Sequence, residues 1–162
     1  MVHKIDKIET ERLLLRGIDE SDAETIVLWR SVSNVYKYFK ASHQISLDEH
    51  LNWYWNRYLS NNDRFDWMCI ERKDKQRIGV FGMVRKGDKA EVNYLLAPEA
   101  QHKGYASEAI QNMIGYAQKK WNTKQIVAEI HEENTPSIIL VQKLGFKLIS
   151  KNAPFVVYGI EV

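Results

Sequence analysis

Residues 94–106 read YLLAPEAQHKGYA, and this stretch decides the fold more than any other part of the chain. The apolar run before Pro98 is typical of a strand that ends there, and an amphipathic helical pattern runs from Ala106 to Trp121. A short polar loop separates the two elements. A helix that opens after such a loop presents unpaired backbone N–H groups at its amino end, and these groups favour a bound phosphate.

The loop residues themselves suit an anionic ligand. Gly104 lets the backbone approach a ligand closely, and Ala106 keeps the first helical turn small. His102 and Lys103 add positive charge nearby. Motifs of other phosphate loops are missing, since the chain has neither Gly-x-Gly-x-x-Gly after an early strand nor Gly-x-x-x-x-Gly-Lys-Ser/Thr. The alternative is an ordinary strand-to-helix connection with a turn glycine.

Composition indicates one domain over residues 1–162, because 162 residues with 44% hydrophobic content can bury one core. The net charge of +2 and the scattered basic residues do not indicate nucleic-acid binding. No apolar run approaches the roughly 20 residues that span a bilayer, and the first residues lack a signal-peptide core. We therefore expect no membrane partner and a cytoplasmic location.

Cysteine and histidine usage argues against thiol or metal chemistry. Cys69 is the single cysteine and lies in the apolar run 67–70, which predicts a buried thiol in a reducing compartment. No metal site is expected, because the histidines never stand at paired ligand spacing with acids or the cysteine. The five histidines are His3, His43, His50, His102 and His131.

The hydrophobic period predicts an order of strand, two helices, three strands, helix, strand, helix and two strands. Strands are expected at residues 13–16, 66–71, 77–85, 90–96, 125–130, 146–150 and 155–161. Capping boxes at Ser21 with Glu24 and at Ser46 with Glu49 predict the starts of the first two helices. Thr135 is the expected cap of the last helix.

The pattern Gln-x-x-Gly-x-Ala at Gln101, Gly104 and Ala106 resembles the pyrophosphate loop of the Gcn5-related N-acetyltransferases (GNAT). Residues 134–138 (NTPSI) and 143–146 (KLGF) resemble a second segment of that family, which flanks the lower part of coenzyme A. The opening residues 9–16 (ETERLLLR) resemble the branch that acetylates ribosomal-protein amino termini, spermidine or sugar amines. The likeness extends over nearly the full chain.

This resemblance implies an α+β fold with a central, mostly antiparallel sheet flanked by helices, and acetyl transfer from acetyl-CoA as co-substrate. It places the pyrophosphate on the backbone amides of residues 101–106 and the pantetheine along the end of the strand before Pro98, with a slot where the adjacent strand splays away. A backbone N–H near Leu96 would bind the acetyl carbonyl oxygen. The expected cofactor-binding residues are Leu95, Leu96, Ala97, Gln101, His102, Lys103, Gly104, Tyr105, Ala106, Ser107, Asn134 and Lys143.

Attack by an alkylammonium near neutral pH requires a base or a water chain that removes its proton. Strand alternation places Glu91 on one face with Asn93 and Leu95, so Glu91 is the first candidate for the catalytic base. His131, which shares a strand face with Glu129, is the second. For each, a solvated strand residue is the alternative interpretation.

One residue departs from the family pattern. Many members carry a tyrosine where this chain has Val141, and that hydroxyl protonates the leaving thiolate. Its role must pass to another group, to water or to none; Tyr105 and Tyr158 are options that the sequence does not select between. The missing acid leaves open a second function, a non-catalytic coenzyme A sensor or partner-binding domain.

Aromatic and basic residues early in the chain lie where the family builds its acceptor pocket. The acceptor is expected to be a small-molecule amine or a peptide amino terminus, with a nucleotide-linked aminosugar as a specific alternative. An antibiotic acceptor would need an acidic pocket. We interpret Leu51 and Trp55 as core, and exposed carboxyl-terminal strands would allow a homodimer. The candidate acceptor residues are Trp29, Arg30, Tyr38, His50 and Tyr54.

Overall fold

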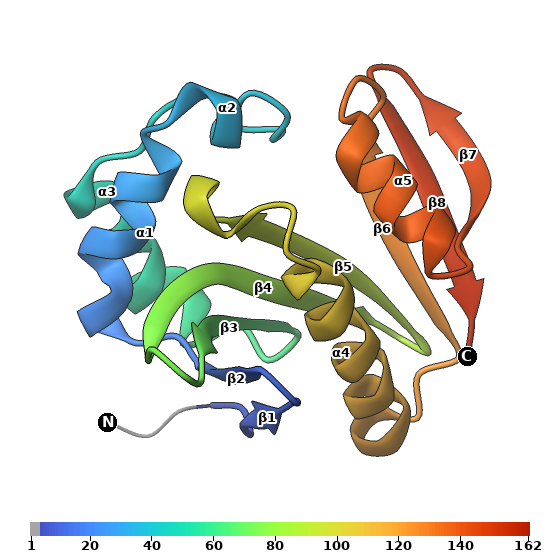
Figure 1. Ribbon diagram of the computed structural model, residues 1–162, viewed down its shortest axis with the longest axis horizontal. Coiled ribbons are helices and arrows are strands. Elements are labelled where there is room, and N and C mark those ends of the chain that lie inside the picture. Colours follow the sequence, from blue (N-terminus) through green and yellow to red (C-terminus); the bar gives the residue numbers. More distant parts are fainter. Residues whose placement is uncertain (1–3) are drawn as a thin grey trace.

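Eight strands form one sheet in the computed structural model, which describes residues 4–162 (Figure 1). His3 lies outside the described residues. The strand order across the sheet is β1-β2-β3-β4-β5-β6-β8-β7. Every neighbouring pair is antiparallel except β5 and β6, which are parallel. The strands are β1 (Ile8–Glu9), β2 (Leu13–Gly17), β3 (Arg64–Glu71), β4 (Gln76–Lys86), β5 (Lys89–Leu96), β6 (Gln125–His131), β7 (Lys147–Asn152) and β8 (Phe155–Glu161).

The helices follow the predicted order, with several short additions. The sequence did not predict β1, the short helix α2 or the 3₁₀ turns η1 and η3. The helices are η1 (Glu20–Asp22), α1 (Ala23–Arg30), α2 (Ser33–Tyr36), α3 (Leu47–Trp53), the π-helical turn η2 (Tyr54–Tyr58), η3 (Pro98–Ala100), α4 (Tyr105–Trp121) and α5 (Thr135–Lys143). None of the described helices is both long and apolar enough to cross a membrane.

The long helix α4 packs against β1, β2 and β5. Its predicted apolar face is confirmed, because Ala109, Ile110, Met113 and Ala117 are fully buried at helical spacing. The connection through η3 leads from the end of β5 at Leu96 to the start of α4 at Tyr105 (Figure 1).

The parallel pair β5 and β6 is joined over a short length only. Residues Lys89–Glu91 of β5 pair with Gln125–Val127 of β6, and no register continues beyond Glu91. The two strands diverge from that point, as Figure 1 shows. The later residues of β5 therefore present one free edge toward the gap, which is the slot that the family resemblance implies.

Two of the expected helix caps were wrong. Asp19, and not Ser21, caps the first turn; its carboxylate accepts from the Ser21 N–H at 2.9 Å, and Asp22 accepts from the Asp19 N–H at 3.0 Å. Asn134, one residue before the expected Thr135, caps α5 and accepts from the Ser137 N–H at 3.5 Å. In both cases a neighbouring residue has a side chain short enough to reach the same N–H groups, and sequence spacing does not choose between them.

The helix that begins at Ser46 starts as predicted, with reciprocal hydrogen bonds between Ser46 and Glu49 at 3.1 and 3.3 Å. Its second half differs from the prediction, because the chain changes to the π turn η2 at Tyr54. Trp55, within this turn, is 48% exposed, so its assignment to the core was wrong. Tyr58 is buried instead.

Candidate active site

The loop before α4 has a backbone suited to holding an anion. His102 and Gly104 both have positive φ, at 63° and 79°. Helix α4 begins after Gly104 without a side-chain cap, so the N–H groups of its first turn are not taken by a capping side chain. Residues 101–104 are exposed, and Ala106 is buried beneath them. The arrangement leaves a positive helix end open to a ligand.

Arg12, directly before β2, and Glu108, in the first turn of α4, hold this loop in place. Arg12 donates to the Lys103 carbonyl oxygen at 2.9 Å, stacks 4.5 Å from the Tyr105 ring centre and pairs with Glu108 at 2.7 Å. Thr10 and the Arg12 N–H also donate to Glu108. Burial alone would raise the pKa of Glu108, but these hydrogen bonds outweigh it and lower the pKa, so the carboxylate stays charged. Glu108 therefore links α4 to the segment before β2 and is not a free acid of the site.

The free edge of β5 supplies the next part of the site. Ala97 is buried and its N–H donates to the Ile78 carbonyl oxygen on β4 at 2.8 Å. Backbone N–H groups alternate in direction along a strand, so the N–H of Leu96 points away from β4 and into the gap. Leu95 and Leu96 are half-buried beside it.

A cavity of about 690 Å³ opens beside this edge. Residues from three paired rows of β3, β4 and β5 line its floor. They are Arg64 and Glu91, with Val84 paired between them, Asp66 and Asn93, with Gly82 paired between them, and Val80 and Leu95. A Cβ on residue 82 would lie 2.1 Å from an Asp66 carboxylate oxygen, so only glycine fits at this position between Asp66 and Asn93. Helices α1 and α3, the segment 38–45 and residues of β6 and β8 close the sides.

The cavity brings together part of the predicted acceptor and catalytic set. Glu91, Leu95, Arg30, Tyr38 and His50 all line it. His131 is not in the lining, but its ring lies 5.3 Å from Tyr38 and 5.5 Å from Phe155, two residues that are.

Two predicted acceptor residues lie elsewhere. Tyr54 is 2% exposed and packs on Tyr58 in the core. Trp29 is 6% exposed and borders a separate hollow with Arg16 and Arg77. An aromatic residue on an amphipathic helix gives the same sequence signal whether it faces the core or a pocket.

The second coenzyme segment is placed beside the gap, but its residues differ in exposure. Asn134 is engaged as the cap of α5, and Lys143 is exposed in the last turn. Val141 is buried. Of the two substitute tyrosines, Tyr105 lies under Arg12 and Tyr158 is buried, and neither lines the cavity.

Tyr94 was not considered for that role, yet it lines the cavity. Its hydroxyl lies 2.8 Å from the Ser137 hydroxyl on α5. Tyr94 therefore connects β5 to α5 across the gap between β5 and β6. Burial raises the pKa of Tyr94, which keeps the hydroxyl protonated at neutral pH.

Sequence reasoning did not foresee Lys40, Lys86, Arg64 and Asp66, which form ion pairs at or beside the cavity. Lys40 pairs with Glu129, Lys86 pairs with Glu91 at 2.7 Å, and Arg64 pairs with the buried Asp66 at 3.0 Å. One signal could have revealed Asp66, since it is a lone acid within the apolar run 65–70. The others are ordinary surface charges in sequence.

Cys69 is fully buried, as predicted, and burial raises the pKa of its thiol to about 12. A thiol in that state carries almost no thiolate at neutral pH, so it is not a nucleophile.

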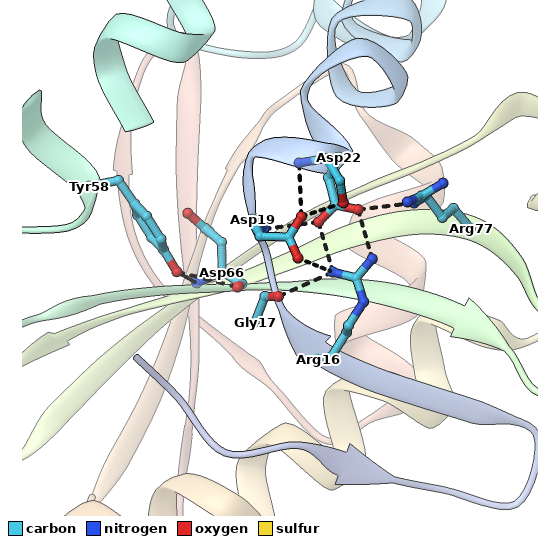
Figure 2. A network of polar contacts seen from close by, with 8 residues as sticks. Arg16, Gly17, Asp19, Asp22, Tyr58, Asp66 and Arg77 are labelled. Atoms are coloured by element: carbon cyan, nitrogen blue, oxygen red, sulfur yellow. Dashed lines mark hydrogen bonds and ion pairs between the residues drawn. The ribbon is translucent and has the colours of Figure 1, made fainter. Parts of the chain in front are cut away.

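A second polar cluster supports the site without lining the cavity. Figure 2 shows Asp22 between Arg16 and Arg77, with both carboxylate oxygens engaged at 2.8–2.9 Å. Asp22 is fully buried at the start of α1, so it ties this helix to β2 and β4. The helix carries Arg30 at its far end, and its position therefore depends on this cluster.

Comparison with known proteins agrees with this architecture. The model of the acetyltransferase (GNAT) domain matches residues 12–147. The uncharacterised N-acetyltransferase YoaA of Bacillus subtilis is 31% identical over 145 residues, which cover 86% of this chain and 82% of that protein.

Solved structures show the same fold. RimL, a ribosomal L7/L12 alpha-N-protein acetyltransferase in complex with coenzyme A, superimposes with a TM-score of 0.85 at 16% identity, covering 97% of this chain and 98% of that one. Spermidine N-acetyltransferase from Vibrio cholerae, in complex with CoA and spermine, gives a TM-score of 0.81 at 22% identity over 94% and 96% of the two chains. The chain belongs to the GNAT family and is an acetyl-CoA-dependent N-acetyltransferase.

Proposed function

We propose that this protein acetylates the primary amine of a small molecule or a peptide amino terminus by direct attack of the amine on the thioester. The observation that carries this proposal is the cavity, which meets the free edge of β5 at Leu95 and contains Glu91 on the same strand face. An amine in the cavity would therefore lie beside the edge where the donor's thioester is expected.

In this proposal the donor is held at two places. The uncapped start of α4 and the loop 101–104 bind the pyrophosphate, and the β5 edge aligns the pantetheine. The Leu96 N–H, which points into the gap, donates to the acetyl carbonyl oxygen and stabilises the negative charge that develops there. Bound acetyl-CoA supplies the activated acetyl group.

Glu91 acts as the base that accepts the proton of the attacking ammonium, directly or through water. It stands at the last paired position between β5 and β6, at the vertex of the gap, and faces the cavity. His131 lies behind Tyr38 and Phe155 and is the second candidate.

Tyr94 donates the proton that the leaving thiolate requires. It is the tyrosine that reaches across the gap to α5, the helix on which the family's usual tyrosine would stand at Val141. With a proton donor at Tyr94, the loss of tyrosine at Val141 no longer favours a purely binding role.

The experiment is a thiol-release assay with acetyl-CoA and a panel of peptides, polyamines and aminosugar nucleotides, with the acetylated amine confirmed by mass spectrometry. We expect release that depends on an added amine. Calorimetry on the same protein measures coenzyme A binding separately. If coenzyme A binds but no amine causes thiol release, the protein is a coenzyme A sensor and the proposal is wrong.

A further inference from the structure

Arg30, at the end of α1, places a positive charge in the wall of the acceptor cavity without a balancing acid. One of its terminal nitrogens, Nη2, donates to the Ala41 carbonyl oxygen at 3.2 Å, and its guanidinium lies 4.8 Å from the Phe39 ring centre. Its Nε is buried and has no hydrogen-bond partner among residues 4–162. None of the ion pairs found in that part of the chain includes Arg30.

Further basic groups surround this guanidinium. Arg30 and Arg64 line the same cavity. Burial lowers the pKa of Arg30, and the positive charge of Arg64 lowers it further. His50 is 5% exposed at the same wall; burial lowers its pKa, and the charge of Arg30 does so as well. Arg64 is 38% exposed, and its guanidinium lies 4.8 Å from the Trp53 ring centre.

The acids of the cavity do not neutralise Arg30, because each of them has another partner. Asp66 is engaged by Arg64, Glu129 by Lys40 and Glu91 by Lys86. Glu49 accepts from the Ser46 N–H at the start of α3. An unpaired guanidinium in a half-buried wall is costly in the empty cavity, and an anionic ligand would offset that cost.

We propose that Arg30 and Arg64 form an anion-binding subsite, and that the acceptor is an amine that also carries a phosphate or carboxylate group. This inference rests on the proposed function. Guanidinium groups bind both anions with paired N–H donors, and a phosphate offers more oxygens to two arginines than a carboxylate does.

The sheet geometry sets the distance between the two ends of such an acceptor. Arg64 on β3 and Glu91 on β5 belong to one row with Val84 between them. Two strand spacings are about 10 Å. The anionic group is therefore expected about 10 Å from the reacting amine, which excludes short amino acids. The positive charges of Arg30 and Arg64 disfavour polyamines.

The test uses a matched set of octylamines whose far end is phosphate, carboxylate, hydroxyl or ammonium, with kcat/KM measured by thiol release. For the wild-type protein we expect kcat/KM for the better of the two anionic amines to exceed that for the hydroxyl amine by about tenfold or more. The ratio of phosphate to carboxylate identifies which anion the subsite takes. Equal values for hydroxyl and anionic ends, or a preference for ammonium, would overturn the inference while leaving the acetyltransferase proposal intact.

Variants locate the effect. Arg30→Gln should remove most of the anionic advantage, and Arg30→Lys should keep part of it, because the charge remains but the paired donors are lost. Arg85→Gln is the matched control, since Arg85 pairs with Asp63 outside the cavity and its loss should leave the ratio unchanged. Circular dichroism verifies that each variant is folded.

A binding measurement keeps the subsite testable if none of these amines is acetylated. Inorganic pyrophosphate is titrated calorimetrically into protein already saturated with coenzyme A, so that the loop before α4 is occupied. Binding to the wild-type protein that Arg30→Gln abolishes supports the subsite. Absence of binding, or equal binding to both proteins, would refute it.

Discussion

Glu91 illustrates what the sequence predicts at the scale of a single residue. Alternation along residues 90–96 placed Glu91, Asn93 and Leu95 on one face, and all three line the cavity. For Trp29 and Tyr54 the sequence pattern predicted pocket residues, but both are buried in the core. Aromatic residues on a helix recur at the same spacing whether they face a core or a pocket. Arg64 and Asp66 escaped notice because a strand charge acquires its role from partners that are distant in sequence.

Replacing Glu91 by glutamine removes the proposed proton acceptor and keeps the side-chain size. We expect kcat to fall about 100-fold with little change in KM for acetyl-CoA, because general-base catalysis contributes on this order. Steady-state kinetics on Glu91→Gln and His131→Ala decide between the candidates. Full turnover in Glu91→Gln together with loss of turnover in His131→Ala would assign the base to His131.

Tyr94→Phe removes one hydroxyl from the gap. We expect a slower acetyl transfer step, about tenfold or more, since the thiolate then leaves without a positioned acid. Because the pKa of Tyr94 is raised, its proton is retained through the neutral range, and the difference from wild type should persist across that range. Single-turnover kinetics measure the step, and Tyr158→Phe is the control. An unchanged rate in Tyr94→Phe would exclude Tyr94 as the acid.

At the scale of elements, the sequence predicted the order and most bounds of the strands and long helices, because their apolar periods are long. The start of α3 at Ser46 is confirmed, and the expected strands 77–85 and 90–96 pair as a hairpin that turns at Gly87, where φ is 63°. The caps at Ser21 and Thr135 were wrong by one or two residues, since Asp19 and Asn134 compete for the same N–H groups. The π turn η2 has no sequence signal that we recognised.

Asp22 connects α1 to the sheet, so its replacement should lower the free energy of unfolding. Asp22→Asn leaves Arg16 and Arg77 without their common carboxylate, and we expect a loss of about 3 kcal/mol in the free energy of unfolding at pH 7. Urea denaturation measures it. Asp63→Asn is the control, because Asp63 is 60% exposed and its ion pair should contribute within about 0.5 kcal/mol.

The pH dependence follows from the same contacts. Burial would raise the pKa of Asp22, but hydrogen bonds from Arg16, the Asp19 N–H and Arg77 outweigh it and lower the pKa below the ordinary 3.8. A depressed pKa stabilises the fold above the unfolded value and loses that effect as the pH falls through the folded value. Wild type should therefore lose more stability below pH 4 than Asp22→Asn does. Parallel losses in the two proteins would contradict this account.

At the scale of the whole molecule, the sheet consists of two parts joined at a short parallel contact. Strands β1 to β5 with α4 form one part, and β6, β8, β7 with α5 form the other (Figure 1). Their strands pair directly through Lys89–Glu91 and Gln125–Val127 only, and the Tyr94–Ser137 contact lies across the gap. The edge strand β7 exposes Leu148 and Ile149, which is compatible with the predicted homodimer.

Coenzyme A that lies in the gap contacts both parts and should stabilise the whole chain. At a ligand concentration of 100 times Kd, the gain is about 2.7 kcal/mol. For a chain of 162 residues, this corresponds to a rise in Tm of about 5–10 °C. Differential scanning calorimetry with and without coenzyme A measures the shift. An unchanged Tm at saturating ligand would exclude the bridging position.

The central claim is that backbone N–H groups of residues 101–106 bind the donor's pyrophosphate, and calorimetric titration of coenzyme A into Gly104→Ala tests it most directly. Gly87→Ala is its matched control, because both glycines have positive φ and a Cβ at Gly87 has no atom within 4 Å. The backbone strain is thus similar, about 1 kcal/mol, and only Gly104 lies in the proposed phosphate loop. We predict at least a tenfold weaker Kd for folded Gly104→Ala and an unchanged Kd for Gly87→Ala. Wild-type affinity in Gly104→Ala would contradict the account.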